Sequence, residues 1–276
     1  MKIDSHQHFW KFNPLNHDWI DDTMSVIKSD FLPKDLESIL KKNSIDGSIL
    51  VQVDQTEKEN DDLLHLAEQN NFIKAVVGWV DLRHKNVEER LAYYSKNIYF
   101  KGIRHIVQSE EQDFLLREDF QNGIGKLMKF NLTYDILIFP NQLESAIQLV
   151  KKFPNQKFIL DHLAKPDIKN QEIDFWKRQI KILAESPNIF CKISGIVTEA
   201  NLNDWRYEDF VPYLDVVFNA FEEDRIMFGS DWPVCLLAAS YKQVYDLILN
   251  YINDFSEYQK AKLLGKNALR IYNIRD

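Results

Sequence analysis

Short runs rich in branched-chain and aromatic residues alternate with longer amphipathic segments along all 276 residues of the chain. Most of these runs carry few charges, which is typical of strands that are buried on both faces of a parallel sheet. The segments between them repeat apolar residues at helical spacing, as in a helix with one buried side. The predicted strands are Lys2–Phe9, Gly47–Asp54, Ile73–Leu82, Phe100–Gln108, Leu132–Phe139, Lys157–Leu163, Ile189–Ile196 and Arg225–Gly229.

This alternation predicts an α/β fold, a single (β/α)8 TIM barrel formed by one domain over residues 1–276. An open doubly wound sheet is the alternative. Such folds usually carry a phosphate-binding turn, however, and no GxGxxG or GxxxxGK(S/T) motif follows any of the predicted strands. The predicted helices are Asp35–Asn43, Asp61–Asn70, Gln142–Phe153, Asn203–Phe221, Lys242–Ile252 and a last one that begins with a capping pattern at Ser256.

The charge balance argues against several classes of partner. The chain has 34 Lys and Arg against 42 Asp and Glu, a formal net charge of −8, whereas nucleic acids and anionic membranes bind clustered basic residues. No apolar stretch approaches the ~20 residues of a membrane span, and a predicted strand at Lys2 leaves no room for a signal peptide. Two cysteines without a CxxC pair fit a reducing compartment. We therefore expect a cytoplasmic protein that binds no nucleic acid and no membrane, with homo-oligomer formation left open.

Polar residues follow several of the predicted strands at their carboxyl ends, where the active site of a TIM barrel lies. His6 and His8 end the first strand, and their spacing of two residues points both side chains in the same direction. His162 follows the sixth strand and Asp231 follows the eighth. The barrel fold therefore predicts that these four residues meet at one mouth.

Each of these residues has two interpretations. His6 and His8 could hold a divalent metal ion or bind a polar substrate oxygen directly. Asp231 could act as a general base toward a bound water, or be a turn aspartate that bonds its own backbone. His162 could act in the site or be a core histidine that donates to a backbone carbonyl.

The fourth strand contributes either Arg104 or His105, which alternate in direction. Ile103 and His105 share one face, which we expect to pack on helices, so Arg104 is predicted to point into the barrel. A barrel-facing arginine is costly to bury unless it meets an anion or a polarised oxygen. Its alternative role is a structural ion pair. Trp232 could form a pocket wall or serve packing alone, and weaker candidates are Tyr134, Asp135 and Lys192.

Six short motifs, in this order, resemble the sugar-lactonase branch of the amidohydrolase superfamily, which includes L-fuconolactonases and L-rhamnonolactonases. The resemblance spans essentially the whole chain and implies a barrel hydrolase. The motifs are Asp4-Ser-His-Gln-His-Phe-Trp10, Val51-Gln-Val53, Gly102-Ile-Arg104, Asp161-His-Leu-Ala-Lys-Pro166, Cys191-Lys-Ile-Ser-Gly195 and Gly229-Ser-Asp-Trp-Pro233.

The resemblance implies positions for a metal ion. His6, His8 and Asp231 match the more buried metal site of the superfamily, and His162 matches a histidine that acts at the reacting carbonyl. Members with two metals carry a bridging lysine or glutamate and two further histidines, and only His162 is available here as a supplement. We therefore expect either no cofactor or a single divalent ion, with zinc as the first choice, held by His6, His8 and Asp231.

The activity expected from this resemblance is hydrolysis of a sugar lactone, a small-molecule substrate, to the hydroxy acid. Asp231 and His162 are the predicted catalytic residues: Asp231 activates water and His162 helps to polarise the carbonyl. One alternative is a mononuclear zinc-dependent amidohydrolase or decarboxylase that acts on a small carboxylate or amide. Another is a ligand-binding barrel without catalysis. The predicted substrate-binding residues are His6, His8, Arg104 and Trp232.

Overall fold

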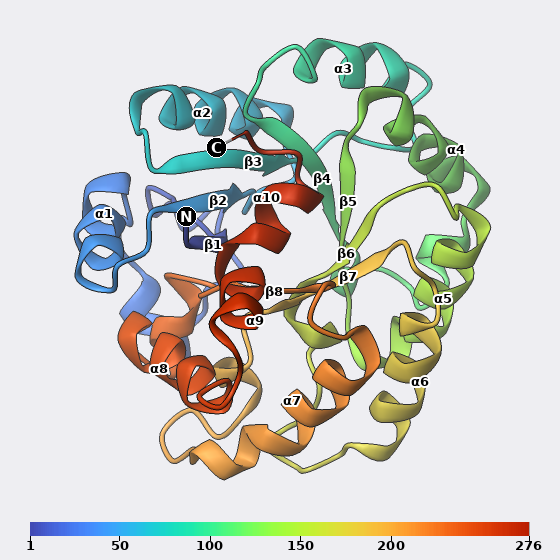
Figure 1. Ribbon diagram of the computed structural model, residues 1–276. Helices are drawn as coiled ribbons and strands as arrows, with labels where there is room; N and C mark the ends of the chain where they lie inside the picture. The colour runs from blue at the N-terminus through green and yellow to red at the C-terminus, as the bar shows by residue number, and fades with distance from the viewer. Residues whose placement is uncertain (276) are drawn as a thin grey trace.

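The computed structural model describes residues 1–275 as a barrel of parallel strands ringed by helices (Figure 1). Each strand pairs in parallel with the next one in the sequence, in the order β1 to β8. Backbone bonds then join the end of β8 to β1: the Asp231 amide donates to the His6 carbonyl, and the His8 amide donates to the Trp232 carbonyl, both at 2.8 Å. The predicted (β/α)8 barrel is confirmed, and a doubly wound sheet is excluded because its strand order would be permuted.

The elements follow the predicted alternation, although the strands are shorter than predicted. The strands are β1 (Ile3–Gln7), β2 (Gly47–Val51), β3 (Ile73–Gly78), β4 (Phe100–Ile106), β5 (Thr133–Leu137), β6 (Phe158–Leu160), β7 (Ile189–Ile193) and β8 (Ile226–Phe228). The helices are α1 (Pro33–Lys42), α2 (Glu57–Gln69), α3 (Val87–Tyr94), α4 (Glu118–Leu127), α5 (Leu143–Lys152), α6 (Asp174–Ala184), α7 (Tyr207–Phe221), α8 (Tyr241–Tyr251), α9 (Glu257–Ala261) and α10 (Asn267–Ile271). Within residues 1–275, no helix is both long and apolar enough to cross a bilayer.

The sixth strand shows the largest error in a functional region. It ends at Leu160, whereas the predicted strand extends to Leu163. From His162 to Lys165 the backbone has positive φ values of 53°, 56°, 58° and 48°, a left-handed conformation that cannot continue a strand. The indole N–H of Trp176 donates to the Leu163 carbonyl at 2.7 Å and holds this turn against α6.

Two helix starts show how side chains set the boundaries. The predicted cap at Ser256 is confirmed, because its hydroxyl accepts a bond from the Gln259 amide at the start of α9. By contrast, α7 begins at Tyr207 rather than at Asn203. The indole N–H of Trp205 donates to the Ala238 carbonyl at 2.9 Å, which ties the preceding residues to the segment after β8 as a loop.

The interior of the barrel is apolar at the end where the strands begin. Helix α10 lies across this end (Figure 1) and packs its side chains against inward-facing strand residues. We call this cluster the apolar floor, and it consists of Ile3, Ile49, Val51, Ala75, Val77, Ile159, Phe190, Met227, Ala268, Ile271 and Tyr272. The opposite faces of the strands pack against the surrounding helices in the main core. The floor therefore separates the polar end of the interior from solvent at the other end.

Candidate active site

Charged and polar side chains from several strands meet in the barrel interior above the apolar floor. Each is no more than 4% exposed. The structure brings together the four predicted strand-end residues and Arg104, and it adds two of the weaker candidates, Asp135 and Lys192, and the unassigned Asp161. We call this set the charged layer, and it consists of His6, His8, Arg104, Asp135, Asp161, His162, Lys192 and Asp231.

An irregularity in β1 lets it contribute to both the floor and the charged layer. Strict alternation would place Ile3 and His6 on opposite faces of the strand. Ile3 nevertheless packs in the apolar floor while His6 lies in the charged layer. The register of β1 against β2 shifts between Asp4 and Gln7, and such a shift changes which face the following residues present. His6 and His8 keep the predicted common direction, with their Nε2 atoms 3.2 Å apart.

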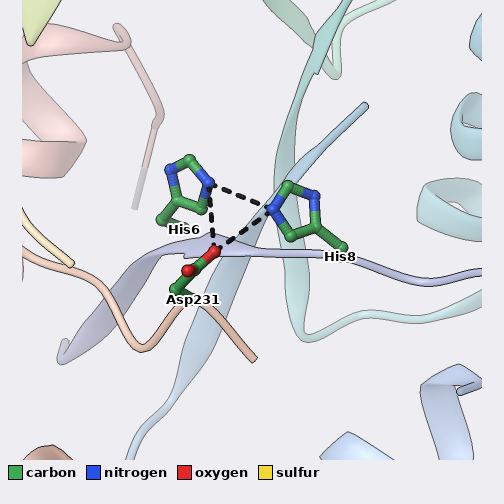
Figure 2. A group of neighbouring side chains, drawn as sticks. All are labelled: His6, His8 and Asp231. Atoms are coloured by element: carbon green, nitrogen blue, oxygen red, sulfur yellow. Dashed lines mark hydrogen bonds and ion pairs between the residues drawn. The ribbon is translucent and has the colours of Figure 1, made fainter. Parts of the chain in front are cut away.

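His6, His8 and Asp231 form a compact group of potential metal ligands (Figure 2). The Asp231 Oδ1 atom lies 3.7 Å from His6 Nε2 and 3.4 Å from His8 Nε2. Ligand atoms of a tetrahedral zinc ion, at ~2.0–2.1 Å from the metal, are about 3.3 Å from one another. The spacing of these three atoms therefore fits a single zinc ion.

The second ring nitrogen of each histidine has a partner that orients the ring. His8 Nδ1 is 2.8 Å from the Val51 carbonyl, which can only accept, so Nδ1 carries the proton and Nε2 offers a lone pair. His6 Nδ1 is 3.4 Å from Asp161 Oδ1. A carbonyl or carboxylate behind a metal-binding imidazole is the usual supporting arrangement. Burial lowers the pKa of His6 well below its ordinary value, so this ring is neutral at neutral pH.

The carboxylate of Asp231 faces imidazoles rather than the backbone of its own turn. Its backbone has a φ of 58°, a left-handed conformation that is uncommon outside glycine. Its Oδ1 atom also lies 4.0 Å from His162 Nε2. Burial by itself would raise the pKa of Asp231, but His162 and the bond from His8 hold it well below its usual range. This group is therefore ionised at neutral pH.

His162 lies beside Asp231 and is supported by β7. Its Nδ1 is 2.9 Å from the Ser194 hydroxyl, and burial lowers its pKa to about 4, so the ring is neutral at neutral pH. Gly195, the residue after Ser194, has a φ of 59°. A Cβ atom at this position would lie 2.6 Å from His162 Nδ1 and 3.0 Å from Asp231 Oδ2. Glycine at this position lets both groups approach one another.

Arg104 points into the barrel, as the alternation of β4 predicted. Its guanidinium donates to the carbonyl and the side-chain oxygen of Gln52. Its Nη1 lies 3.5 Å from Asp161 Oδ2 and 3.4 Å from His6 Nε2. Its Nε–H, although buried, has no acceptor among residues 1–275. His105 faces outward, where it stacks on Phe114.

The charged layer contains an ion-pair network that the sequence indicated only weakly. Lys192 Nζ lies 2.6 Å from Asp135 Oδ2 and 3.0 Å from Asp161 Oδ1, and all three side chains are fully buried. Asp135 and Lys192 stood among the weaker candidates, and Asp161 lay unassigned beside His162. The available signal was a charged residue inside an otherwise apolar strand, which needs a partner when it is buried.

A further buried carboxylate, Asp4, holds the segment that carries Asp231 in place. Asp4 accepts bonds from the amide and the hydroxyl of Ser230, at 2.9 and 2.6 Å, and from the Tyr241 hydroxyl at 3.0 Å. Burial raises the pKa of Asp4 to about 6.

The residue after Asp231, Trp232, is 2% exposed and packs edge-on against aromatic rings of the core. Its predicted role in substrate binding stays a prediction.

An eight-stranded barrel with histidines and carboxylates at the carboxyl ends of its strands is the architecture of a TIM-barrel enzyme. A family model described as Amidohydrolase matches residues 3–274. The L-fucono-1,5-lactonase of Burkholderia multivorans is 36% identical, covering 99% of this chain and 96% of the relative. The L-fucono-1,5-lactonase of Burkholderia ambifaria is 31% identical, again covering 99% of this chain and 96% of the relative.

A solved structure gives the same result for the fold. The crystal structure of an amidohydrolase from Burkholderia multivorans with bound zinc is 35% identical, with a TM-score of 0.96 and 100% of both chains covered. The chain therefore belongs to the amidohydrolase family. This membership confirms the resemblance that the sequence motifs indicated, and with it the expected class of barrel hydrolase.

Proposed function

We propose that this protein hydrolyses a sugar lactone of the L-fuconolactone type to the open-chain hydroxy acid. The observation that carries the proposal is a buried, ionised carboxylate, Asp231, that faces three imidazoles at the mouth of an amidohydrolase barrel. Two relatives that align over nearly their full lengths are named for this reaction. A cyclic ester is also a carbonyl compound that one base and fixed hydrogen-bond donors can hydrolyse.

Asp231 is the general base of the proposed reaction. Its carboxylate takes a proton from water, and the water oxygen forms a bond to the carbonyl carbon. The bond between that carbon and the ring oxygen then breaks, and the proton passes to the ring oxygen, which becomes a hydroxyl group. The products are the carboxylate and a proton released to solvent. The low pKa of Asp231 keeps the acceptor ionised before each turnover.

The neutral imidazole of His162 supplies a donor to the carbonyl oxygen. If the Ser194 hydroxyl donates to His162 Nδ1, the ring proton lies on Nε2, which faces the site beside Asp231. A donor aimed at the developing oxyanion stabilises the transition state more than the substrate. The unsatisfied Nε–H of Arg104 is a further donor for a substrate oxygen, because buried donors in folded proteins are rarely without a partner.

A single divalent ion fits the same site. His6 Nε2, His8 Nε2 and Asp231 Oδ1 would hold it, as their mutual spacing allows. When bound, zinc would lower the pKa of water and polarise the carbonyl. With or without the ion, Arg104 and His162 orient the substrate, and Asp231 remains the carboxylate that faces all three imidazoles.

A hydrolysis screen of aldonolactone stereoisomers with a pH indicator tests this function. The enzyme would be assayed after chelator treatment and again after zinc is restored, with an enzyme-free blank for spontaneous ring opening. We expect faster hydrolysis of L-fuconolactone and closely related L-sugar lactones than of their enantiomers. If no lactone is opened at either zinc load, while an amide or a small carboxylate is consumed with zinc, the protein is instead a zinc-dependent amidohydrolase or decarboxylase.

A further inference from the structure

The Lys192 ammonium lies at the centre of a buried ring of metal-ligand types. Its Nζ atom is 2.6 Å from Asp135 Oδ2, 3.0 Å from Asp161 Oδ1 and 3.3 Å from His6 Nδ1. The Lys192 side chain itself is completely buried. Carboxylate oxygens and imidazole nitrogens are the usual ligands of zinc. The ammonium is therefore surrounded by the atoms that would surround a metal ion.

Two potential metal sites share His6, one on each ring nitrogen. The first group consists of His6, through its Nε2 atom, His8 and Asp231. The second group consists of His6, Asp161 and His162. In the second group, His6 Nδ1 and Asp161 Oδ1 are 3.4 Å apart. Lys192 Nζ contacts both of these atoms. A fixed cation thus contacts two of the three residues of the second group, whereas in the first group Arg104 lies 3.4 Å from His6 Nε2 and touches neither of the other two residues in the described part of the chain.

We propose that the Lys192 ammonium takes the place of a second metal ion and limits this site to one divalent cation. The ammonium supplies a positive charge to Asp161 and repels a divalent ion that would use Asp161 and His6 Nδ1. Removing it leaves the buried layer one unit more negative and frees the second group of ligands. A second ion on His6 Nδ1 would displace the proton of that nitrogen to solvent, because a neutral imidazole has only one lone pair. The inference concerns the number of cations and holds whichever bond the enzyme breaks.

The ammonium is anchored from the apolar floor. Tyr272, the residue after α10, donates its hydroxyl to Asp135 Oδ2 at 2.6 Å, and the same oxygen accepts from Lys192. The Thr133 hydroxyl lies 3.2 Å from the other oxygen of Asp135. The ring of Tyr272 lies 5.4 Å from Lys192 Nζ, within the range of a cation–π contact. These contacts hold Nζ in one place rather than leaving it to move aside for a metal.

Zinc stoichiometry tests the proposal without an activity assay. Wild type, Lys192→Met and Arg104→Met would be stripped with chelator, dialysed against the same buffered free zinc and analysed for zinc per chain. Wild type should hold no more than one zinc, and Lys192→Met should hold one more than wild type. Arg104→Met is the matched control, because Arg104 is the other buried cation beside His6 and Asp161 but contacts His6 Nε2 and Asp161 Oδ2, not the His6 Nδ1 and Asp161 Oδ1 atoms that Lys192 contacts. It should gain none.

Further variants keep the test decisive. Adding His162→Asn to Lys192→Met should abolish the additional ion if His162 is one of its ligands. If Lys192→Met does not fold, the double variant Lys192→Met/Asp135→Asn removes the buried ion pair as a unit, which is better tolerated than losing one partner. It should also gain one zinc. A wild type that binds two ions, an unchanged zinc count in the lysine variants, or an equal gain in Arg104→Met would each overturn the proposal.

Discussion

The two ends of the barrel interior carry opposite kinds of side chain although the same strands build both. On β6, Ile159 lies in the apolar floor, and Asp161 lies two residues further along in the charged layer. On β7, Phe190 and Lys192 have the same relation. Because residues two apart share a face of a strand, the boundary between the floor and the charged layer lies between two consecutive inward-facing residues in these two chain segments.

The difference assigns separate tasks to the two ends. The apolar floor stabilises the barrel by burying apolar surface. It also keeps water that enters from the floor end of the barrel away from the ion pairs of the charged layer. The charged layer contributes little net stability, because burying charges costs about as much as pairing them returns. Changes in the apolar floor should therefore affect mainly stability, and changes in the charged layer should affect mainly turnover.

The largest expected effect follows from Asp231→Asn in the charged layer. The variant loses the proposed proton acceptor while keeping the shape of the side chain, so kcat/KM on the best lactone should fall by about 10²–10⁴-fold. Thermal unfolding should show that the variant is folded. Asp204→Asn, on the exposed loop after β7, is the control and should retain full activity. Near-wild-type turnover by Asp231→Asn would exclude this residue as the base.

Ile49→Ala tests the role of the apolar floor. Ile49 is fully buried in the floor, and truncating a buried isoleucine costs about 2–5 kcal/mol of unfolding free energy. Urea unfolding would measure this loss, and Ile49→Val should lose only about 0.5–1.5 kcal/mol. Activity per folded molecule should stay within roughly two-fold of wild type, well below the 10²-fold effect of losing a base. A large loss of kcat in the folded variant would mean that the two ends are not separable.

The sequence predicts the part of this comparison that depends on strand alternation. Arg104 points inward and His105 outward because alternate residues of β4 face opposite sides. His162 and Asp231 meet because parallel strands in a barrel end at one rim. These predictions need only the order of the strands and the direction of the chain.

The rest depends on contacts between distant elements. Tyr272 and Asp135 are separated by 137 residues, and their bond exists only because α10 crosses the apolar floor. The left-handed turn after β6 is held by the bond from Trp176 to Leu163, a residue that falls inside the predicted strand. Neither contact leaves a periodic pattern in the sequence.

The smallest expected effect concerns Glu59, a carboxylate at the site end whose hydrogen-bond partners are backbone amides. Glu59 accepts bonds from the amides of Val53 and Asp54, at 2.7 and 2.9 Å, in the loop after β2. Burial raises the pKa of Glu59 to about 8, from an ordinary value of 4.5. The folded protein therefore holds this proton more tightly than the unfolded chain does. Between about pH 5 and pH 8 the contribution of Glu59 to stability must fall as pH rises.

Urea unfolding of wild type and Glu59→Gln at pH 5, 6, 7 and 8 would measure this contribution. The unfolding free energy of wild type minus that of the variant should decrease across the series, by on the order of 1–2 kcal/mol for a partly exposed group. Glu89→Gln, on the exposed face of α3, should leave the difference independent of pH. Parallel stability curves for wild type and Glu59→Gln would show that this carboxylate is ionised throughout. The charged layer would then not be the only place at this end where a carboxylate keeps its charge.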